Sequence, residues 1–182
     1  MTIAGRYRAA DPLTPTSAAK TALHSIARRW AALDTEIRAL DHDIKTILDT
    51  IAAPLLARHG VGYETAGSLL CAAGDNPHRL ATEASFAALC GTSPVPVSSG
   101  RTNRHRLNRA GDRQANAALW RIVIVRLRSQ HAPTINYLDR RLTAGNSKRD
   151  AIRCLKRYLA RELYHDIQAI IATTQPRSKI AA

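Results

Sequence analysis

The chain has 182 residues, of which 45% are hydrophobic and 23% charged, so it can bury a core and is not wholly disordered. Its length suits one domain, or one domain with an appended segment. It carries 27 basic and 14 acidic residues, for a formal net charge of +13. This excess predicts a polyanionic partner, most simply nucleic acid, and argues against an acidic enzyme with a small cationic substrate.

No apolar run approaches the length of about 20 residues that crosses a bilayer, and the N-terminus lacks the apolar core of a signal peptide. We therefore expect a cytoplasmic protein without a membrane partner. Cys71, Cys90 and Cys154 are odd in number and widely spaced, which indicates free thiols in a reducing compartment. No Cys-x-x-Cys pair occurs, so a structural zinc site is not expected.

The positive charge is concentrated in one region. Residues 1–99 hold nine basic and nine acidic residues, whereas residues 100–166 hold sixteen basic and five acidic residues. The polyanion-binding face is therefore predicted within 100–166. The alternative is a solvated basic helix surface, although solvated faces usually mix charges of both signs.

Residues 1–20 show little periodicity and are predicted to form a flexible lead-in. Residues 21–53 follow with apolar residues at alternating spacings of three and four, which is the heptad pattern of a coiled-coil helix. This heptad seam comprises Leu23, Ile26, Trp30, Leu33, Ile37, Leu40, Ile44, Ile47 and Ile51. We expect a homo-oligomer formed through residues 22–52. The alternative is one long helix packed along its own domain.

The segment after Pro54 resembles a helix-hairpin-helix: an apolar helix end, the turn Gly60-Val61-Gly62, and Thr65 where the next helix opens. Glycines allow a tight turn and close approach of a ligand, and amides at a helix N-terminus attract phosphate. This pattern predicts contact with the DNA backbone without sequence readout. An ordinary helix–glycine–helix turn is the alternative.

The remaining pattern predicts an all-α fold, with a helical domain over residues 54–171 and a disordered tail over 172–182. We expect helices over 63–73, 82–90, about 111–130, and from the capping-box-like Ser147 onward. Pro133 is expected to end the third of these. Only a short extended piece near Val95–Val97 is expected outside helices.

Several chemistries do not suit this sequence. The acidic residues are scattered, so a carboxylate metal site is not expected, and aromatic residues are only 4%, which disfavours a base-stacking platform. The Ser98-Ser99-Gly100 loop could bring a serine hydroxyl to a phosphodiester, although Ser-Gly pairs are mostly turns. The DNA-binding candidates beside it are Arg101, Arg104, Arg106, Arg109 and Arg113.

Four features occur in one order: the heptad helix, HGVGYETAGSLLCAAGD, FAALCGTSPVPVSSG and NRAGDRQANAALW. Over about residues 22–170 this order resembles the C-terminal half of the insertion-sequence 110 family, the bridge-RNA-guided transposases. Members have a RuvC-like domain with a carboxylate set, a coiled coil, and a transposase domain bearing a nucleophilic serine. The resemblance implies that Ser99 is the nucleophile, with Ser98 as the alternative.

The resemblance further implies that a structured guide RNA selects the target. It also implies that Mg²⁺ is held by the RuvC-like domain of a partner, such as a full-length transposase, and not by this chain. The sequence lacks that domain, so we expect no catalysis by this chain alone. The expected function is that of a DNA-binding transposase segment. The alternatives are a non-catalytic nucleic-acid-binding module and a dominant-negative oligomerising remnant.

Overall fold

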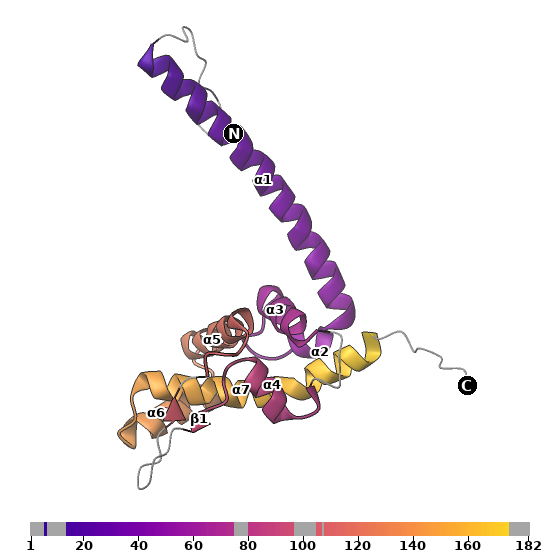
Figure 1. The fold of residues 1–182 in the computed structure, drawn as a ribbon, viewed down its shortest axis with the longest axis vertical. Helices are drawn as coiled ribbons and strands as arrows, with labels where there is room; N and C mark the ends of the chain where they lie inside the picture. The colour runs from indigo at the N-terminus through magenta and orange to yellow at the C-terminus, as the bar shows by residue number, and fades with distance from the viewer. Residues whose placement is uncertain (1–5, 7–13, 75–79, 97–104, 107, 175–182) are drawn as a thin grey trace, which may run out of the picture. The chain divides into compact units, whose positions relative to one another are not determined.

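The computed structural model describes residues 6, 14–74, 80–96, 105–106 and 108–174, which are almost entirely helical (Figure 1). The expected all-α fold with a long N-terminal helix is confirmed. The chain divides into two units, residues 1–46 and residues 47–182. Within the described ranges, no helix is both long enough and apolar enough to traverse a lipid bilayer.

The long helix α1 (Pro15–Ile51) has 37 residues, which corresponds to about 55 Å at 1.5 Å per residue. It begins inside the segment 1–20 that was expected to be a flexible lead-in, so that boundary was wrong. The reason is local: the Thr14 hydroxyl oxygen accepts a hydrogen bond from the Ser17 amide at 3.3 Å. Pro15 then occupies the first helical position, where its fixed φ suits the helix.

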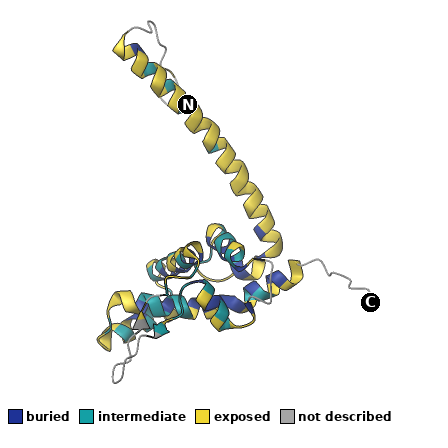
Figure 2. Cartoon of the chain, viewed as in Figure 1, coloured by how far each residue is buried: buried dark blue, intermediate teal, exposed yellow. Residues whose placement is uncertain are grey.

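The apolar seam of α1 is exposed in the described part of the chain. All nine seam residues are 36–65% exposed, and the helix is coloured as exposed along nearly its whole length (Figure 2). A contiguous apolar stripe of this kind on a helix normally marks a surface that another molecule covers. The helix is thus observed, whereas its pairing as a coiled coil stays a prediction.

The second unit has a core built around its last helix, α7 (Lys148–Thr174). Its other helices are α2 (Ala53–Leu56), α3 (Tyr63–Ala73), α4 (Glu83–Leu89), α5 (Arg113–Arg128) and α6 (Ala132–Thr143). The helices α2, α4, α5 and α6 pack against α7, and α3 packs against α5. The largest fully buried side chains are Leu55, Leu69, Leu80, Phe86, Leu119, Ile122, Leu163 and Ile167.

Most helix boundaries of this unit follow from capping residues that the sequence contains. Gly74 ends α3 with φ 69°, a backbone conformation that glycine tolerates. The Thr82 hydroxyl accepts from the Ser85 amide at 3.1 Å and opens α4. Ser147 caps α7 in the same way through the Asp150 amide at 3.1 Å. These are the helix starts and stops that the sequence predicted.

Two expectations at the C-terminal side were wrong. Pro133 does not end α5, which already stops at Arg128, but lies in the first turn of α6, where a missing amide proton is tolerated. The helix α6 was therefore not predicted. The helix α7 runs to Thr174, so residues 172–174 of the expected disordered tail are helical, and residues 175–182 lie outside the described residues.

The extended piece expected near Val95 is present as β1 (Val95–Pro96), which pairs antiparallel with β2 (His105–Arg106). Val95 pairs with Arg106 and Pro96 with His105. The pairing brings together Pro96 and His105, the residues that flank segment 97–104. Ser98, Ser99, Arg101 and Arg104 belong to that segment and lie outside the described residues.

Candidate nucleic-acid interface

The site is built on a close crossing of two chain segments at the end of α4. Gly91 follows α4 with φ 63°, and the backbone of Gly111 lies directly against it. The Asp112 amide donates to the Leu89 carbonyl at 2.6 Å. The Asn116 side-chain amide donates to the Cys90 carbonyl at 2.7 Å. These contacts fix the start of α5 against the end of α4.

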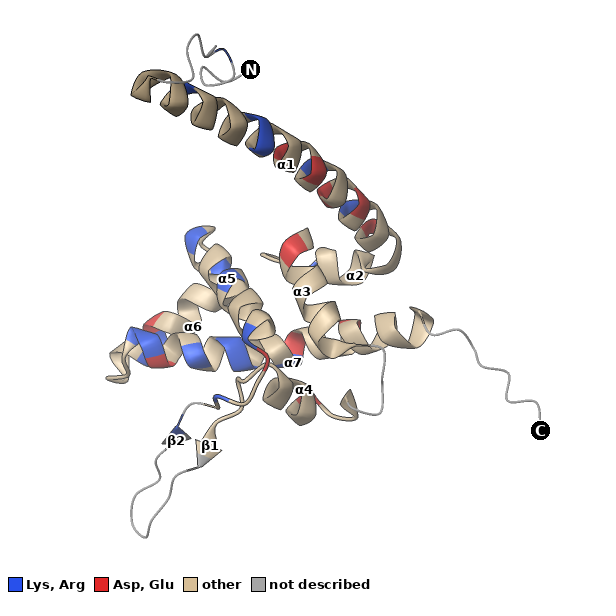
Figure 3. Ribbon diagram, turned by 45° about the horizontal axis from the view of Figure 1, so that its top comes forward, with Lys and Arg blue, Asp and Glu red and all other residues tan. Residues whose placement is uncertain are grey.

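A pocket of about 370 Å³ lies beside this crossing, between the segment 91–94, β2 and the N-terminal half of α7. Its lining holds four basic side chains and a single carboxylate. The lining residues are Gly91, Thr92, Ser93, Pro94, Arg106, Asn108, Asp150, Arg153, Cys154, Lys156, Arg157 and Tyr158. We call it the basic pocket. Figure 3 shows Lys and Arg distributed over α5, α6 and the N-terminal half of α7.

Two of the four cations of the basic pocket are held by neutral groups. The Lys156 ammonium donates to the Asn116 amide oxygen at 2.7 Å, and Arg157 donates to the Ser93 hydroxyl at 2.9 Å. Among the described residues, neither has an ion-pair partner. Burial, and then repulsion from Arg153, lower the pKa of Lys156. The pocket therefore favours an anion that would relieve this repulsion.

The single carboxylate of the pocket is already engaged. Asp150 pairs with Arg153 at 2.7 Å and accepts from the Ser147 hydroxyl at 2.6 Å. The Ser147 hydrogen bond, followed by the charge of Arg153, lowers the pKa of Asp150. In the described part of the chain, no group of three His, Cys, Asp or Glu side chains is placed to hold a metal ion. These residues fit a phosphate group and do not fit Mg²⁺.

The segment predicted as a hairpin forms a turn between α2 and α3, and two of its amides are internally bonded. The Val61 amide donates to the Arg58 carbonyl at 3.0 Å, and the Gly62 amide donates to the Thr65 hydroxyl at 3.0 Å. Thr65 is buried, and its hydroxyl also donates to the Gly62 carbonyl at 2.9 Å. A phosphate bound at this turn would have to share the amide protons of Val61 and Gly62 with the oxygens that already accept them.

The two glycines of the hairpin differ in their surroundings. Gly60 has φ 81°, and a Cβ there would lie 3.1 Å from the Arg126 side chain and 3.2 Å from the Ile122 carbonyl. Arg126 in turn donates to the His59 carbonyl at 2.8 Å, which ties the turn to α5. Around Gly62 no atom of the described residues lies within 4 Å of a Cβ position. Gly60 thus serves packing, whereas Gly62 leaves open space for a ligand.

Of the predicted arginines that the structure describes, one lines the basic pocket and the others do not. Arg106 lines the basic pocket, while Arg109 and Arg113 are exposed and have no place in its lining. The sequence analysis predicted the binding face within residues 100–166 but did not name Arg153, Lys156 and Arg157 among the DNA-binding candidates. Their spacing of three and four puts them on one face of α7, and this was the signal that could have identified them.

A comparison with known protein families found a match that covers part of the second unit. Residues 52–139 match the family model described as Transposase IS116/IS110/IS902 family. The matched range runs from α2 into α6 and includes the hairpin, the β1–β2 pair and Arg106, but not the three cations on α7. No curated protein matches the chain. The family match supports a transposase-type role in DNA transposition and, with it, interaction with DNA.

Proposed function

We propose that this chain is a DNA-binding segment of a transposase, and that the basic pocket binds the sugar-phosphate backbone. The observation that carries the proposal is Lys156: a half-buried cation among Arg106, Arg153 and Arg157 that has no ion pair among the described residues. Phosphate oxygens would supply the missing negative charge and accept from the forked guanidinium donors. Such contacts position DNA without reading its sequence.

The chemistry proposed for this chain is a transesterification by Ser99, with Ser98 as the alternative, and it derives from the family resemblance. The serine oxygen would form a bond to phosphorus as one phosphorus–oxygen bond of the DNA breaks. The departing sugar oxygen would take up the proton that the serine loses, so atoms balance without an oxidant or reductant. We expect the reaction to require a partner's RuvC-like domain, its Mg²⁺ and a guide RNA.

A second proposed role follows from the exposed seam of α1. Two such helices would bury their seams against each other and form a homo-oligomer, or one would pair with a full-length transposase. In the second case the chain would act as a dominant-negative oligomerising remnant. A non-catalytic nucleic-acid-binding role would need only the basic pocket. Covalent protein–DNA product distinguishes the transposase segment from both of these alternatives.

The backbone-binding proposal is tested by removing charge inside and outside the basic pocket. The variant K156Q/R157Q removes two cations from the lining, and K148Q/R149Q removes two exposed cations from the same helix as a matched control. Duplex DNA binding is measured by fluorescence anisotropy as a function of salt, and circular dichroism verifies folding. If about six phosphates are contacted, wild-type affinity should fall roughly a thousandfold between about 50 and 200 mM salt.

We expect K156Q/R157Q to lower the slope of log affinity against log salt by about two, as expected for the loss of two phosphate contacts. The control should retain most of the wild-type slope. Equal losses in both variants would mean that net charge alone, and not the basic pocket, holds DNA. A flat salt dependence in the wild type would overturn the backbone-binding proposal as a whole.

A further inference from the structure

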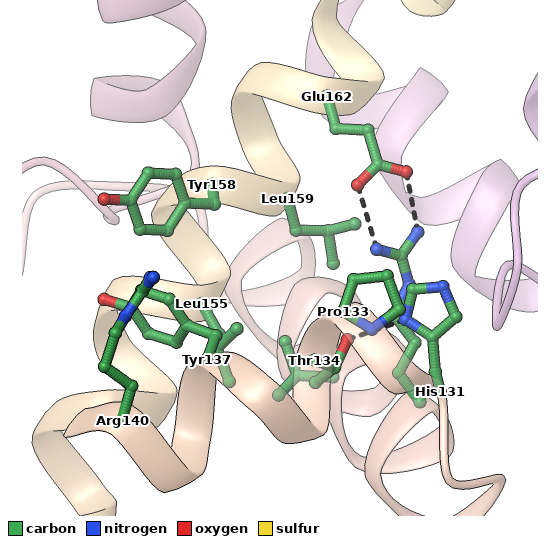
Figure 4. A pocket seen from close by; sticks show the side chains of 11 residues that line it. His131, Pro133, Thr134, Tyr137, Arg140, Leu155, Tyr158, Leu159 and Glu162 are labelled. Carbon is green, nitrogen blue, oxygen red and sulfur yellow. Dashed lines mark hydrogen bonds and ion pairs between the residues drawn. The ribbon is translucent and has the colours of Figure 1, made fainter. Parts of the chain in front are cut away.

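A second pocket, of about 500 Å³, lies between α5, α6 and α7 (Figure 4). It falls within the size range of small-molecule sites and combines apolar, aromatic and charged walls. Leu155 and Leu159 supply the apolar surface, and the polar end holds Arg126, His131 and Glu162. Nothing in the backbone-binding proposal uses this pocket.

Two of the five tyrosines of the chain meet at the aromatic end of this pocket. The rings of Tyr137 and Tyr158 lie edge to face, with centroids 5.3 Å apart and planes at 71°. The Arg140 guanidinium carbon lies 5.5 Å from the Tyr137 ring centroid. Tyr158 is 53% exposed, so it offers an aromatic surface to a planar ring. Burial, followed by hydrogen bonding with Cys154, raises the pKa of Tyr137 to about 12 and keeps its phenol neutral.

The opposite end of this second pocket holds the carboxylate of Glu162, which Arg126 fixes in place. Arg126 donates to both oxygens of Glu162, at 2.9 and 2.8 Å, and this hydrogen bonding, the largest cause, lowers the pKa of Glu162. An ionised carboxylate only accepts hydrogen bonds, and its two oxygens offer about four acceptor positions. Arg126 uses two of these. Glu162 is 38% exposed and can therefore still accept from an N–H group that enters the pocket.

The two pockets share one wall. Tyr158 lines both the basic pocket and this second pocket, and it is followed along α7 by the residues of the carboxylate end. In a nucleotide the base is joined to the phosphate through one sugar. A strand whose phosphate lies in the basic pocket can therefore place an adjoining base over Tyr158.

We propose that this second pocket holds one unstacked DNA base that carries an exocyclic amino group. The base would stack on Tyr158 and donate its amino protons to Glu162. This inference rests on the proposed binding of DNA in the basic pocket. A single pocket of this kind is compatible with a chain that has few aromatic residues, because it stacks one base and not a row of bases.

The test compares strands of about 15 nucleotides that share a backbone and differ in their bases. Wild-type protein is titrated with oligo-dC, oligo-dT and a fully abasic strand at one salt concentration. Cytosine carries an exocyclic amino group and thymine does not. We expect dC to bind about tenfold tighter than the abasic strand, with dT near the abasic value. Equal affinity for dC and the abasic strand would overturn the proposal, and equal affinity for dC and dT would overturn the amino-group requirement.

The variant Y158L keeps an apolar wall but removes the stacking surface. It should abolish the preference for dC over the abasic strand by weakening dC binding more than abasic-strand binding, whereas K156Q/R157Q should weaken all strands by the same factor and keep that preference. If Y158L weakens the abasic strand as much as dC, Tyr158 acts only on the backbone and the base pocket is refuted. If no strand shows salt-dependent binding, the proposed function fails instead, which is a separate outcome.

Photocrosslinking gives the location directly. A strand containing 5-iodo-deoxycytidine retains the amino group and should crosslink to a peptide that contains Tyr158 or Tyr137, identified by mass spectrometry. Crosslinks confined to other peptides would overturn the assignment of the pocket. A ribose version of the dC strand is the control for the source of the base, and tighter binding of that strand would overturn DNA as the ligand.

Discussion

A Cβ atom on Gly111 would lie 2.2 Å from the backbone nitrogen of Gly91 and 2.3 Å from its Cα. Both atoms belong to the backbone, so no side chain can move aside to make room. The crossing also carries the Asp112–Leu89 hydrogen bond and supports Asn116, which holds Lys156. The geometry of the basic pocket thus depends on the contact between Gly91 and Gly111, which are twenty residues apart in the sequence.

The first prediction concerns this contact. Gly111→Ala should destabilise the second unit by about 3 kcal/mol or more, because an added methyl group would force the two backbones apart. Gly62→Ala is the control, since no atom in the described part of the chain lies within 4 Å of its Cβ position, and it should change stability by less than about 1 kcal/mol. Urea denaturation followed by circular dichroism measures both. Equal stability of the two variants would contradict the close contact.

The second prediction concerns pH. Burial, followed by the charges of Arg126 and His59, lowers the pKa of His131, although Glu162 acts in the opposite direction. The unfolded state therefore takes up a proton at His131 more readily than the folded state does. Folding stability should decrease as pH falls below about 6.5, the ordinary value for histidine, and should not change from this source above it.

His131→Gln is the test of that dependence. Free energies of unfolding measured from about pH 7.5 to 5.5 should decline less steeply in the variant than in the wild type. His165→Gln, which removes an exposed histidine beside Glu83, is the matched control. A wild-type decline that persists unchanged in His131→Gln would show that another group is responsible.

The third prediction concerns the exposed seam of α1. Ile37→Asp together with Ile44→Asp would place charge in the paired seam at a cost of several kcal/mol, and should yield a smaller species in sedimentation. Ala32→Asp with Ala39→Asp puts the same charge at heptad positions away from the seam and should leave the oligomer intact. A wild-type chain that is already monomeric at tens of micromolar would refute the coiled-coil prediction.

The fourth prediction concerns the serine. With a RuvC-like partner, Mg²⁺, a matching guide RNA and cognate DNA ends, the wild type should form a covalent protein–DNA adduct on denaturing gels. Ser99→Ala should abolish the adduct and change DNA binding by less than about 1 kcal/mol, because one hydroxyl contributes little net affinity. Ser98→Ala should retain the adduct. The reverse result would move the nucleophile to Ser98, and an adduct in both variants would refute Ser99 as the required nucleophile.

The sequence predicted those helices whose ends carry their own signals. The hydroxyls of Thr82 and Ser147 and the glycines after α3 and α4 act within one turn, so a local reading finds them. The helix α6 was missed because proline permits both a helix end and a helix start. Which one occurs depends on α5 having already ended at Arg128, which is a tertiary outcome.

The candidate site was less predictable than the fold. The four cations of the basic pocket, Arg106 among them, lie within the region 100–166, whereas their binding to DNA stays a prediction. The orientation of α7, however, depends on the residues that it packs against. Lys156 faces Asn116, which lies forty residues earlier in the sequence. A two-residue strand such as β2 also offers too few positions for any periodicity to be read.

The range of the family match has a practical consequence for isolating this domain. The match ends at residue 139, inside α6, yet Leu159, Leu163 and Ile167 of α7 are part of the same core. A protein cut at the matched boundaries would expose that core and lose three of the four cations of the basic pocket. A piece that retains the core residues of α7 and the whole pocket extends at least through Ile171, and binding measurements should be made with the whole of α7 in place.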